Sequence, residues 1–168
     1  GVYRLLDKDR NGALEEAHKI VSFKGDLSEH SAHGLTLGPD GRIYCVLGNH
    51  VSFEGEFAES SPLKVSYEGD LVGPRYEDPG GHAAGIKAPG GTVIRFDTEG
   101  ESVELVAGGL RNAYDLAFHP NGRLYVHDSD MESDEGSVWY RPTSLYEVSE
   151  GAEYGWRSGW AKWPSYYF

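Results

Sequence analysis

Two stretches of the chain repeat one another, and this repeat constrains the fold more than any other feature of the sequence. Residues 34–44, GLTLGPDGRIY, are echoed 81 positions later by residues 115–125, DLAFHPNGRLY. In both stretches, alternating apolar residues lead into a Pro-Asp-Gly or Pro-Asn-Gly turn, after which a second apolar run begins. This pattern is typical of a β-hairpin. The sequence therefore predicts the same hairpin twice.

A second, shorter pair of similar segments extends the repeat. Residues 2–5, VYRL, resemble residues 93–96, VIRF, at an offset of 91, and the ten extra positions fall in the longer turn of residues 7–19. Each repeat then holds two hairpins, and four short strands per unit are typical of a β-propeller blade. The 23 glycines, 8 prolines and 11 tyrosines also favour short strands and turns. We therefore expect an all-β fold with about two to three blades.

The spacing of the repeats is about twice that of ordinary propeller blades. The residues that lengthen this spacing are 51–91, which are rich in Gly, Pro, Ser and Glu and have little periodicity. We expect this segment to be a long inserted loop, mostly irregular, on the same face as His30. Because a closed propeller needs at least four blades, residues 1–168 are expected to be a fragment of a single propeller domain. Six apolar positions of the hairpins should be buried between neighbouring blades: Leu35, Leu37, Ile43, Leu116, Phe118 and Leu124.

The charge of the chain bears on its partners. With 27 acidic and 15 basic residues, the formal net charge is −12, so the attraction that drives binding to nucleic acid or to anionic membranes is missing. No apolar run approaches the length that a membrane-spanning helix needs. Cys45 is the single cysteine and lies within an apolar run, where it is interpreted as a small buried side chain. A neutral ligand or a cation fits this composition better than nucleic acid does.

Two acidic segments are candidate metal sites. In residues 7–12 the D-x-D-x-N-G spacing of Asp7, Asp9 and Asn11 is typical of a calcium loop, although His18 holds the twelfth position and Glu15 or Glu16 would have to replace the usual glutamate. A polar hairpin turn is the alternative. The second segment follows the expected strand of residues 124–127, and its carboxylates repel one another unless a cation or an arginine compensates. It contains Asp128, Asp130, Glu132, Asp134 and Glu135.

Polar residues also precede the first strand of each repeated hairpin. His30 and His33 stand before or at the start of the first hairpin, and Arg111 and Asn112 stand before the second. Histidine can act as a general acid or base or can bind a ligand, while the planar guanidinium of arginine binds carboxylates through two hydrogen bonds. Asn49 ends the return strand of the first hairpin. Because an antiparallel hairpin brings its two ends together, we expect His30, Asn49, Arg111 and Asn112 to be neighbours.

These motifs resemble those of a known family. The series is H-x-x-x-x-L-x-x-G-P-D-G (residues 30–41), G-x-R-N (109–112), H-P-N-G-x-L-Y-V (119–126) and Y-G-W (154–156). It is similar to the soluble quinoprotein glucose/sorbosone dehydrogenases, six-bladed propellers that use pyrroloquinoline quinone (PQQ). D-S-D-M-E (128–132), W-Y-R-P (139–142) and G-W-R-S-G (155–159) look like the membrane-bound dehydrogenase domain subgroup, which often carries a haem-binding cytochrome c domain. The resemblance implies a partial six-bladed propeller.

The resemblance also implies roles for individual residues. His30 falls on the catalytic histidine that takes a proton from a sugar hydroxyl as hydride passes to the quinone, and Arg111 and Asn112 fall on the pair that holds PQQ. The family has an aspartate where this chain has Asn49, and a neutral amide cannot stabilise a charged imidazolium as a carboxylate does. The calcium-binding carbonyls of the family fall on Asp130 and Met131, so carboxylates would replace them as Ca²⁺ ligands here.

Three functions follow as hypotheses. The first is PQQ-dependent oxidation of a sugar hydroxyl at the mouth of the propeller channel, with a cytochrome c domain as electron acceptor and a periplasmic or secreted location. The second is a propeller that binds carbohydrate without turning it over, which Asn49 favours. The third is a calcium-dependent hydrolase similar to lactonases, because such propellers also place acids and histidines at the channel mouth.

Overall fold

The structure is a computed structural model, and it describes residues 1–26, 28–68, 83–129 and 143–158. In these ranges the regular elements are all β-strands, which agrees with the predicted all-β class. The strands are β1 (Val2–Leu6), β2 (Glu16–Val21), β3 (Phe23–Gly25), β4 (Ala32–Leu37), β5 (Ile43–Leu47), β6 (Val51–Phe53), β7 (Gly91–Phe96), β8 (Glu104–Leu110), β9 (Asn112–Phe118), β10 (Leu124–Ser129) and β11 (Ser144–Val148). No helix among the described residues is long and apolar enough to cross a membrane.

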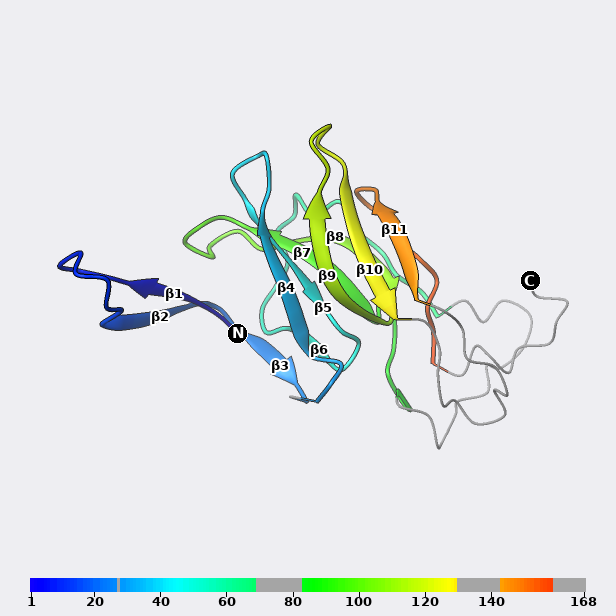
Figure 1. The fold of residues 1–168 in the computed structure, drawn as a ribbon. Coiled ribbons are helices and arrows are strands. Elements are labelled where there is room, and N and C mark those ends of the chain that lie inside the picture. The colour runs from blue at the N-terminus through cyan, green and yellow to red at the C-terminus, as the bar shows by residue number, and fades with distance from the viewer. Residues whose placement is uncertain (27, 69–82, 130–142, 159–168) are drawn as a thin grey trace, which may run out of the picture.

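The strands form four antiparallel sheets (Figure 1). The largest has the order β4-β5-β7-β8, and beside it lies the three-stranded sheet β11-β10-β9. Two smaller sheets, β1-β2 and β3-β6, complete the set. Among the described strands none of the sheets closes into a barrel. The propeller arrangement therefore stays a prediction, whereas the antiparallel sheets are present.

The two repeated hairpins have the same register. β4 pairs with β5, and β9 pairs with β10. When 81 is added to the numbers of two paired residues in the first hairpin, the result is a pair in the second hairpin. Both turns contain a glycine with a positive φ, Gly41 at 78° and Gly122 at 87°, a conformation that other residues rarely adopt. The matching pairs are Leu35 with Cys45 and Leu116 with Val126, Thr36 with Tyr44 and Ala117 with Tyr125, and Leu37 with Ile43 and Phe118 with Leu124.

Three strands of the four-stranded sheet, β5, β7 and β8, are buried on both faces, whereas β4 at its edge is partly exposed. Side chains alternate along β5, so that Cys45 and Leu47 enter one apolar cluster while Tyr44 and Val46 enter another. The first cluster also includes Val2 and Val21 of the β1-β2 hairpin. The second joins the sheet to β9 and β10 through Ala113, Leu116, Leu124 and Val126. The core is therefore layered, with β4-β5-β7-β8 in the middle.

Residues 51–91 are mostly irregular where the structure describes them, as predicted. Within 51–68 and 83–90 the regular element is β6, which pairs with β3. The segment also covers the outer edge of β8, because the N–H groups of Ala58 and Leu63 donate to the carbonyls of Val103 and Leu105 at 2.8 and 3.0 Å. The segment therefore completes a sheet edge in addition to forming a loop. Residues 69–82 lie outside the described part.

The prediction that all six hairpin positions are buried is wrong for two of them. Leu116 and Leu124 are buried, Ile43 and Phe118 are half-buried, and Leu35 and Leu37 are 51% and 65% exposed. The reason lies in the neighbouring layer. Leu116 of β9 packs into the apolar cluster that joins β9 and β10 to β5. Leu35 and Leu37 of β4 instead line a groove of about 350 Å³, whose other wall includes Tyr3 of the β1-β2 hairpin.

The matched leucines provide a test of this difference. Leu116→Ala should lower the free energy of unfolding by about 2–4 kcal/mol, because it leaves a cavity in the core. Leu35→Ala, at the equivalent position of the other hairpin, should cost less than about 1 kcal/mol in the same chain. Urea denaturation of the two variants measures both values. Equal losses would contradict the difference in burial.

Candidate functional site

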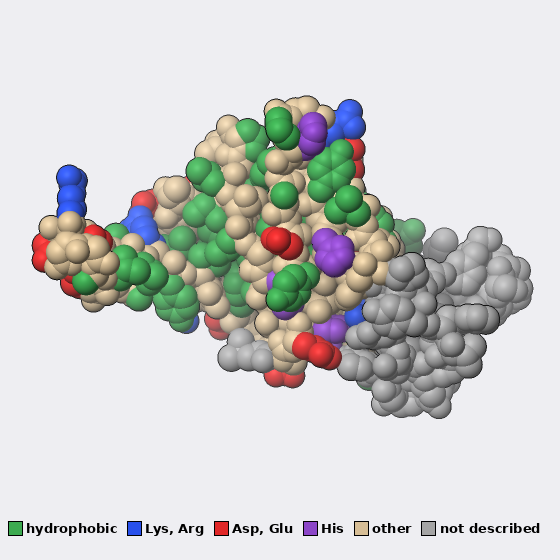
Figure 2. Space-filling view, in the orientation of Figure 1, with side chains coloured by type: hydrophobic (Ala, Val, Ile, Leu, Met, Phe, Trp, Pro, Cys, Tyr) green, Lys and Arg blue, Asp and Glu red, His purple; other side chains and the backbone are tan. Residues whose placement is uncertain are grey.

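The predicted neighbours meet where β5 ends and β9 begins. Three backbone hydrogen bonds join the segments: Gly48 N–H donates to Ser31 C=O at 2.7 Å, His50 N–H to His30 C=O at 3.2 Å, and Asn49 N–H to Arg111 C=O at 2.8 Å. The three residues after β5 therefore contact both the segment that carries His30 and the residue before β9. On the face shown in Figure 2, histidine side chains gather over β4 and β9.

His30 is enclosed by its neighbours. Its side chain is 1% exposed, and its Nδ1 atom lies 2.7 Å from Oδ1 of Asn49. The predicted hydrogen-bond contact between these two residues is confirmed. Because an amide oxygen is an acceptor, this contact places a proton on Nδ1 and the lone pair of the ring on Nε2. The ring of His50 lies beside it, with the two ring centroids 4.6 Å apart.

Burial sets the protonation state of His30. Removal from water is the largest effect and lowers the pKa of His30 to about 4, with a further lowering from the positive charge of Arg111. The hydrogen bond that His30 donates to Asn49 raises the pKa, but this effect is smaller. His30 is therefore a neutral imidazole at neutral pH. It can accept a proton, although its low pKa makes it a weak base.

Arg111 brings a positive charge to this site. The residue is 3% exposed, and its backbone N–H donates to Asp128 Oδ2 at 3.0 Å while Nη1 donates to Ser129 Oγ at 3.0 Å. Its Nη2 atom is buried and has no hydrogen-bond partner among the residues that the structure describes. Among the described residues no carboxylate forms a salt bridge with the guanidinium. A buried cationic donor of this kind favours an anionic oxygen as its partner.

The side chain of Asn112 is used within the protein. Its Oδ1 lies 2.9 Å from Nε2 of His33, and its Nδ2 donates to the backbone carbonyl of Glu29 at 3.2 Å. Asn112 therefore reaches the segment that carries His30. Sequence reasoning placed Asn112 near His30, but it gave no signal for the bond to His33.

Gly48 was also missed from the sequence, and its role is steric. A Cβ atom at this position would lie 2.4 Å from the carbonyl oxygen of His30 and 2.6 Å from Oδ1 of Asn112. Any larger residue would push these two groups apart. The available signal was the Gly-Asn-His sequence at the end of an apolar strand, where a glycine often marks close approach of the backbone to another group.

Asp128 supports the start of β9. Its Oδ2 and Oδ1 atoms accept the backbone N–H groups of Arg111 and Asn112 at 3.0 and 2.8 Å. The carboxylate is 6% exposed and was predicted as a metal ligand. In the structure the carboxylate of Asp128 accepts hydrogen bonds from two successive backbone amides, a role that differs from the predicted metal binding. The other residues of that predicted metal cluster, Asp130, Glu132, Asp134 and Glu135, lie outside the described residues.

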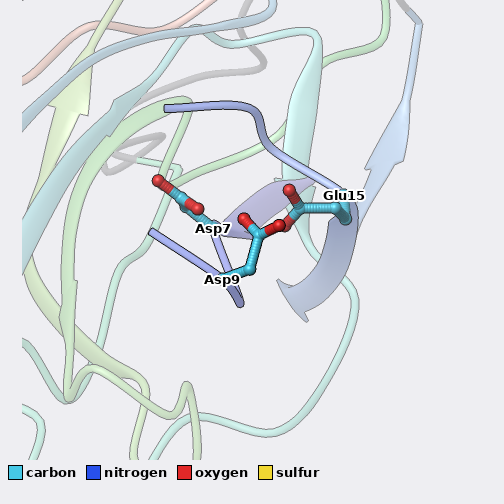
Figure 3. Close-up of side chains that lie close together, drawn as sticks. All are labelled: Asp7, Asp9 and Glu15. Atoms are coloured by element: carbon cyan, nitrogen blue, oxygen red, sulfur yellow. The ribbon is translucent and has the colours of Figure 1, made fainter. Parts of the chain in front are cut away.

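The first acidic segment forms the turn between β1 and β2. Asp7, Asp9 and Glu15 have carboxylate oxygens within 4.8 Å of one another, and Figure 3 shows Asp9 and Glu15 pointing toward each other. Asn11 does not join them as an oxygen donor, because its Oδ1 accepts the N–H of Ala13 and its Nδ2 donates to Asp9.

Backbone amides already occupy part of this cluster. Both carboxylate oxygens of Asp7 accept N–H groups, from Asn11 and Gly12. Asp97 does the same in the turn between β7 and β8, where amide hydrogen bonds, chiefly that of Glu101, lower its pKa. The aspartates therefore serve as turn acceptors in both hairpins. Calcium in the first turn stays a prediction.

Comparison with known proteins adds no family assignment: no family model matches this chain, and no curated protein matches it. The quinoprotein resemblance of the motifs, together with PQQ and calcium, therefore stays a prediction.

The burial of His30 predicts a pH dependence of stability. The unfolded chain has a histidine pKa near 6.5, above the folded value of about 4, so it binds more protons between these limits. Stability should be highest above about pH 6.5 and should fall as the pH drops toward 4. His30→Asn, which keeps a donor for Asn49, should reduce this slope in urea denaturation at several pH values. The exposed His127→Asn is the matched control, and equal slopes in both variants would contradict the assignment to His30.

Calcium binding at the β1-β2 turn has its own test. With three carboxylates and no bidentate twelfth-position ligand, we expect a dissociation constant no tighter than about 10⁻⁴ M. Asp9→Asn should weaken binding at least fivefold in calorimetric titration with CaCl₂. Asp26→Asn, an exposed aspartate outside the turn, should have no effect. Unchanged affinity in Asp9→Asn would exclude this turn as the calcium site.

Proposed function

We propose that this chain belongs to a PQQ-dependent sugar dehydrogenase of the propeller type, with His30 as the general base. One observation carries the proposal: a buried neutral histidine, held at Nδ1 by Asn49, shares a site with Arg111. The repeated hairpins and the layered packing of the sheets support the propeller as its scaffold. The sequence motifs supply the choice of reaction.

His30 would accept the proton of a sugar hydroxyl at Nε2. The Asn49 contact assigns the Nδ1 proton and leaves Nε2 as the basic atom, which is the arrangement that a general base requires. Burial keeps the ring neutral at physiological pH, so no proton has to leave before the reaction. The same burial lowers the driving force for proton transfer. We therefore expect a slow enzyme, in which the base is correctly protonated but weak.

The described residues fit an anionic cofactor at Arg111. PQQ carries carboxylates, and the buried Nη2 atom of Arg111 has no partner within residues 1–26, 28–68, 83–129 and 143–158, so this nitrogen is the donor that would hold a carboxylate of the quinone. Asn112 fits less well, because its amide already contacts Glu29 and His33. When bound, the quinone would supply the hydride acceptor. Arg111 would bind and orient it, and the enclosed His30 would lie beside it.

The remaining elements of the proposal rest on the sequence resemblance. These are calcium as a second cofactor, a cytochrome c domain as the electron acceptor, and a periplasmic or secreted location. The acidic cluster Asp7, Asp9 and Glu15 supports a divalent cation in this chain, although it lies in the β1-β2 turn, away from His30 along the sequence.

A second candidate function is sugar binding without turnover. The neutral Asn49 and the low pKa of His30 favour it, because neither stabilises the imidazolium that proton abstraction would create. In that case the same polar site would serve as a hydrogen-bonding pocket. The two functions make different predictions for variants of His30 and Asn49.

The test is quinone-dependent dye reduction by the full-length protein with PQQ, CaCl₂ and a panel of aldoses. His30→Ala should abolish the activity, at least 10³-fold. Asn49→Asp should raise kcat severalfold, because a carboxylate at Nδ1 raises the pKa of His30 and stabilises its charged form. His127→Ala is the matched control and should leave the rate unchanged.

The outcomes separate the two functions. Sugar binding in calorimetry, combined with no dye reduction that His30→Ala removes, would favour the binding function. A rate that does not rise in Asn49→Asp, with the NMR titration of His30 shifted upward as expected, would contradict His30 as the base.

A further inference from the structure

We infer that His33 and Asn112 form a positioning pair that holds the segment carrying His30, and that Asn112 does this instead of contacting the cofactor. The inference rests on the proposed function of His30. It assigns a positioning role to His33, for which the family resemblance implies none, and it replaces the cofactor-binding role predicted for Asn112.

The contacts of Asn112 fix the orientation of its amide. The group at one end lies 3.2 Å from the carbonyl oxygen of Glu29, which can only accept a hydrogen bond, so this end must be Nδ2. The other end is then Oδ1, and it lies 2.9 Å from Nε2 of His33. His33 must donate there. One side chain on β9 therefore binds the residue before His30 and the residue three positions after it.

We call the pair of His33 and Asn112 the clamp, and neighbouring residues of β9 and β10 hold both of its members in place. Asp128 at the end of β10 accepts the backbone N–H groups of Arg111 and Asn112, which fixes the peptide from which the Asn112 side chain extends. The ring of His33 packs against Tyr114, with centroids 4.8 Å apart. Both members of the pair are therefore held by contacts with β9 or β10. The anchors lie about 80 to 100 residues from His30 in the sequence.

The clamp acts on the same backbone that meets Gly48 and His50. The carbonyls of His30 and Ser31 accept the N–H groups of His50 and Gly48, so the segment is held on one side by Asn112 and on the other by residues 48–50. Loss of the Asn112 contacts would remove one of the restraints on this segment. The His30 ring would then sample more orientations than the one it has in the structure.

Three substitutions separate positioning from cofactor contact. His33→Phe keeps the ring against Tyr114 but removes the donor, whereas His33→Gln supplies an amide donor that can reach Asn112. Asn112→Asp places a carboxylate oxygen against the Glu29 carbonyl, where two acceptors repel. His33→Phe and Asn112→Asp should loosen the segment, and His33→Gln should restore it.

Hydrogen exchange of backbone amides, followed by NMR in the full-length protein, gives a readout independent of activity. The amides of Gly48 and His50 donate to the clamped segment, while the amide of Asn49 donates to Arg111 and serves as the internal control. Exchange at Gly48 and His50 should rise at least tenfold in His33→Phe and Asn112→Asp and should stay within about twofold of the wild type in His33→Gln. The amide of Asn49 should change less.

Kinetics provide the second readout. In the dye-reduction assay kcat should fall at least tenfold in His33→Phe, with the apparent affinity for PQQ changed less than twofold and with recovery in His33→Gln. Unchanged exchange at Gly48 and His50 in both disrupting variants would overturn the inference, as would a loss of PQQ affinity in Asn112→Asp without faster exchange. If the full-length protein shows no dehydrogenase activity, the proposed function fails, but the exchange result still decides whether the clamp exists.

Discussion

The burial of β5, β7 and β8 on both faces of their sheet is the constraint on which the rest of the structure depends. Because Cys45 and Leu47 point to one apolar cluster and Tyr44 and Val46 to the other, a slip of one residue in β5 would exchange all four between faces. The register is therefore fixed by packing. Gly48, Asn49 and His50, which follow directly, are carried to a fixed place at the end of the sheet.

The site depends on this placement because its groups come from separate segments. Asn49 joins His30 through its side chain and Arg111 through its backbone. Enclosure of the imidazole then keeps His30 neutral, and one guanidinium nitrogen of the enclosed Arg111 has no partner in the described part of the chain. Burying polar groups in this way opposes folding unless hydrogen bonds compensate. Asp128 provides part of that compensation through the amides of Arg111 and Asn112.

A second buried polar group lies outside the site and had no signal in the sequence. Glu104 is 2% exposed and contacts Arg95 at 2.5 Å and Arg42 at 2.8 Å. Burial opposes its ionisation, but Ser60 and the two arginines outweigh that effect and lower the pKa of its carboxyl. Arg42 and Arg95 come from β-segments more than 50 residues apart. No local pattern links them.

The sequence by itself determined the local structure. Alternating apolar residues with Pro-Asp-Gly and Pro-Asn-Gly turns predicted two equivalent hairpins, and the geometry of a hairpin predicted that His30 and Asn49 would meet. These features depend on interactions between residues close in the chain. The tertiary structure decided the rest. It left Leu35 exposed while burying the equivalent Leu116, and it joined Asn112 to Glu29 and His33. Such outcomes depend on which strand lies on which face. The repeat predicted that Arg111 and Asn112 would lie near His30, but it could not specify which side chains would meet there, because that depends on packing between segments about 80 residues apart in sequence.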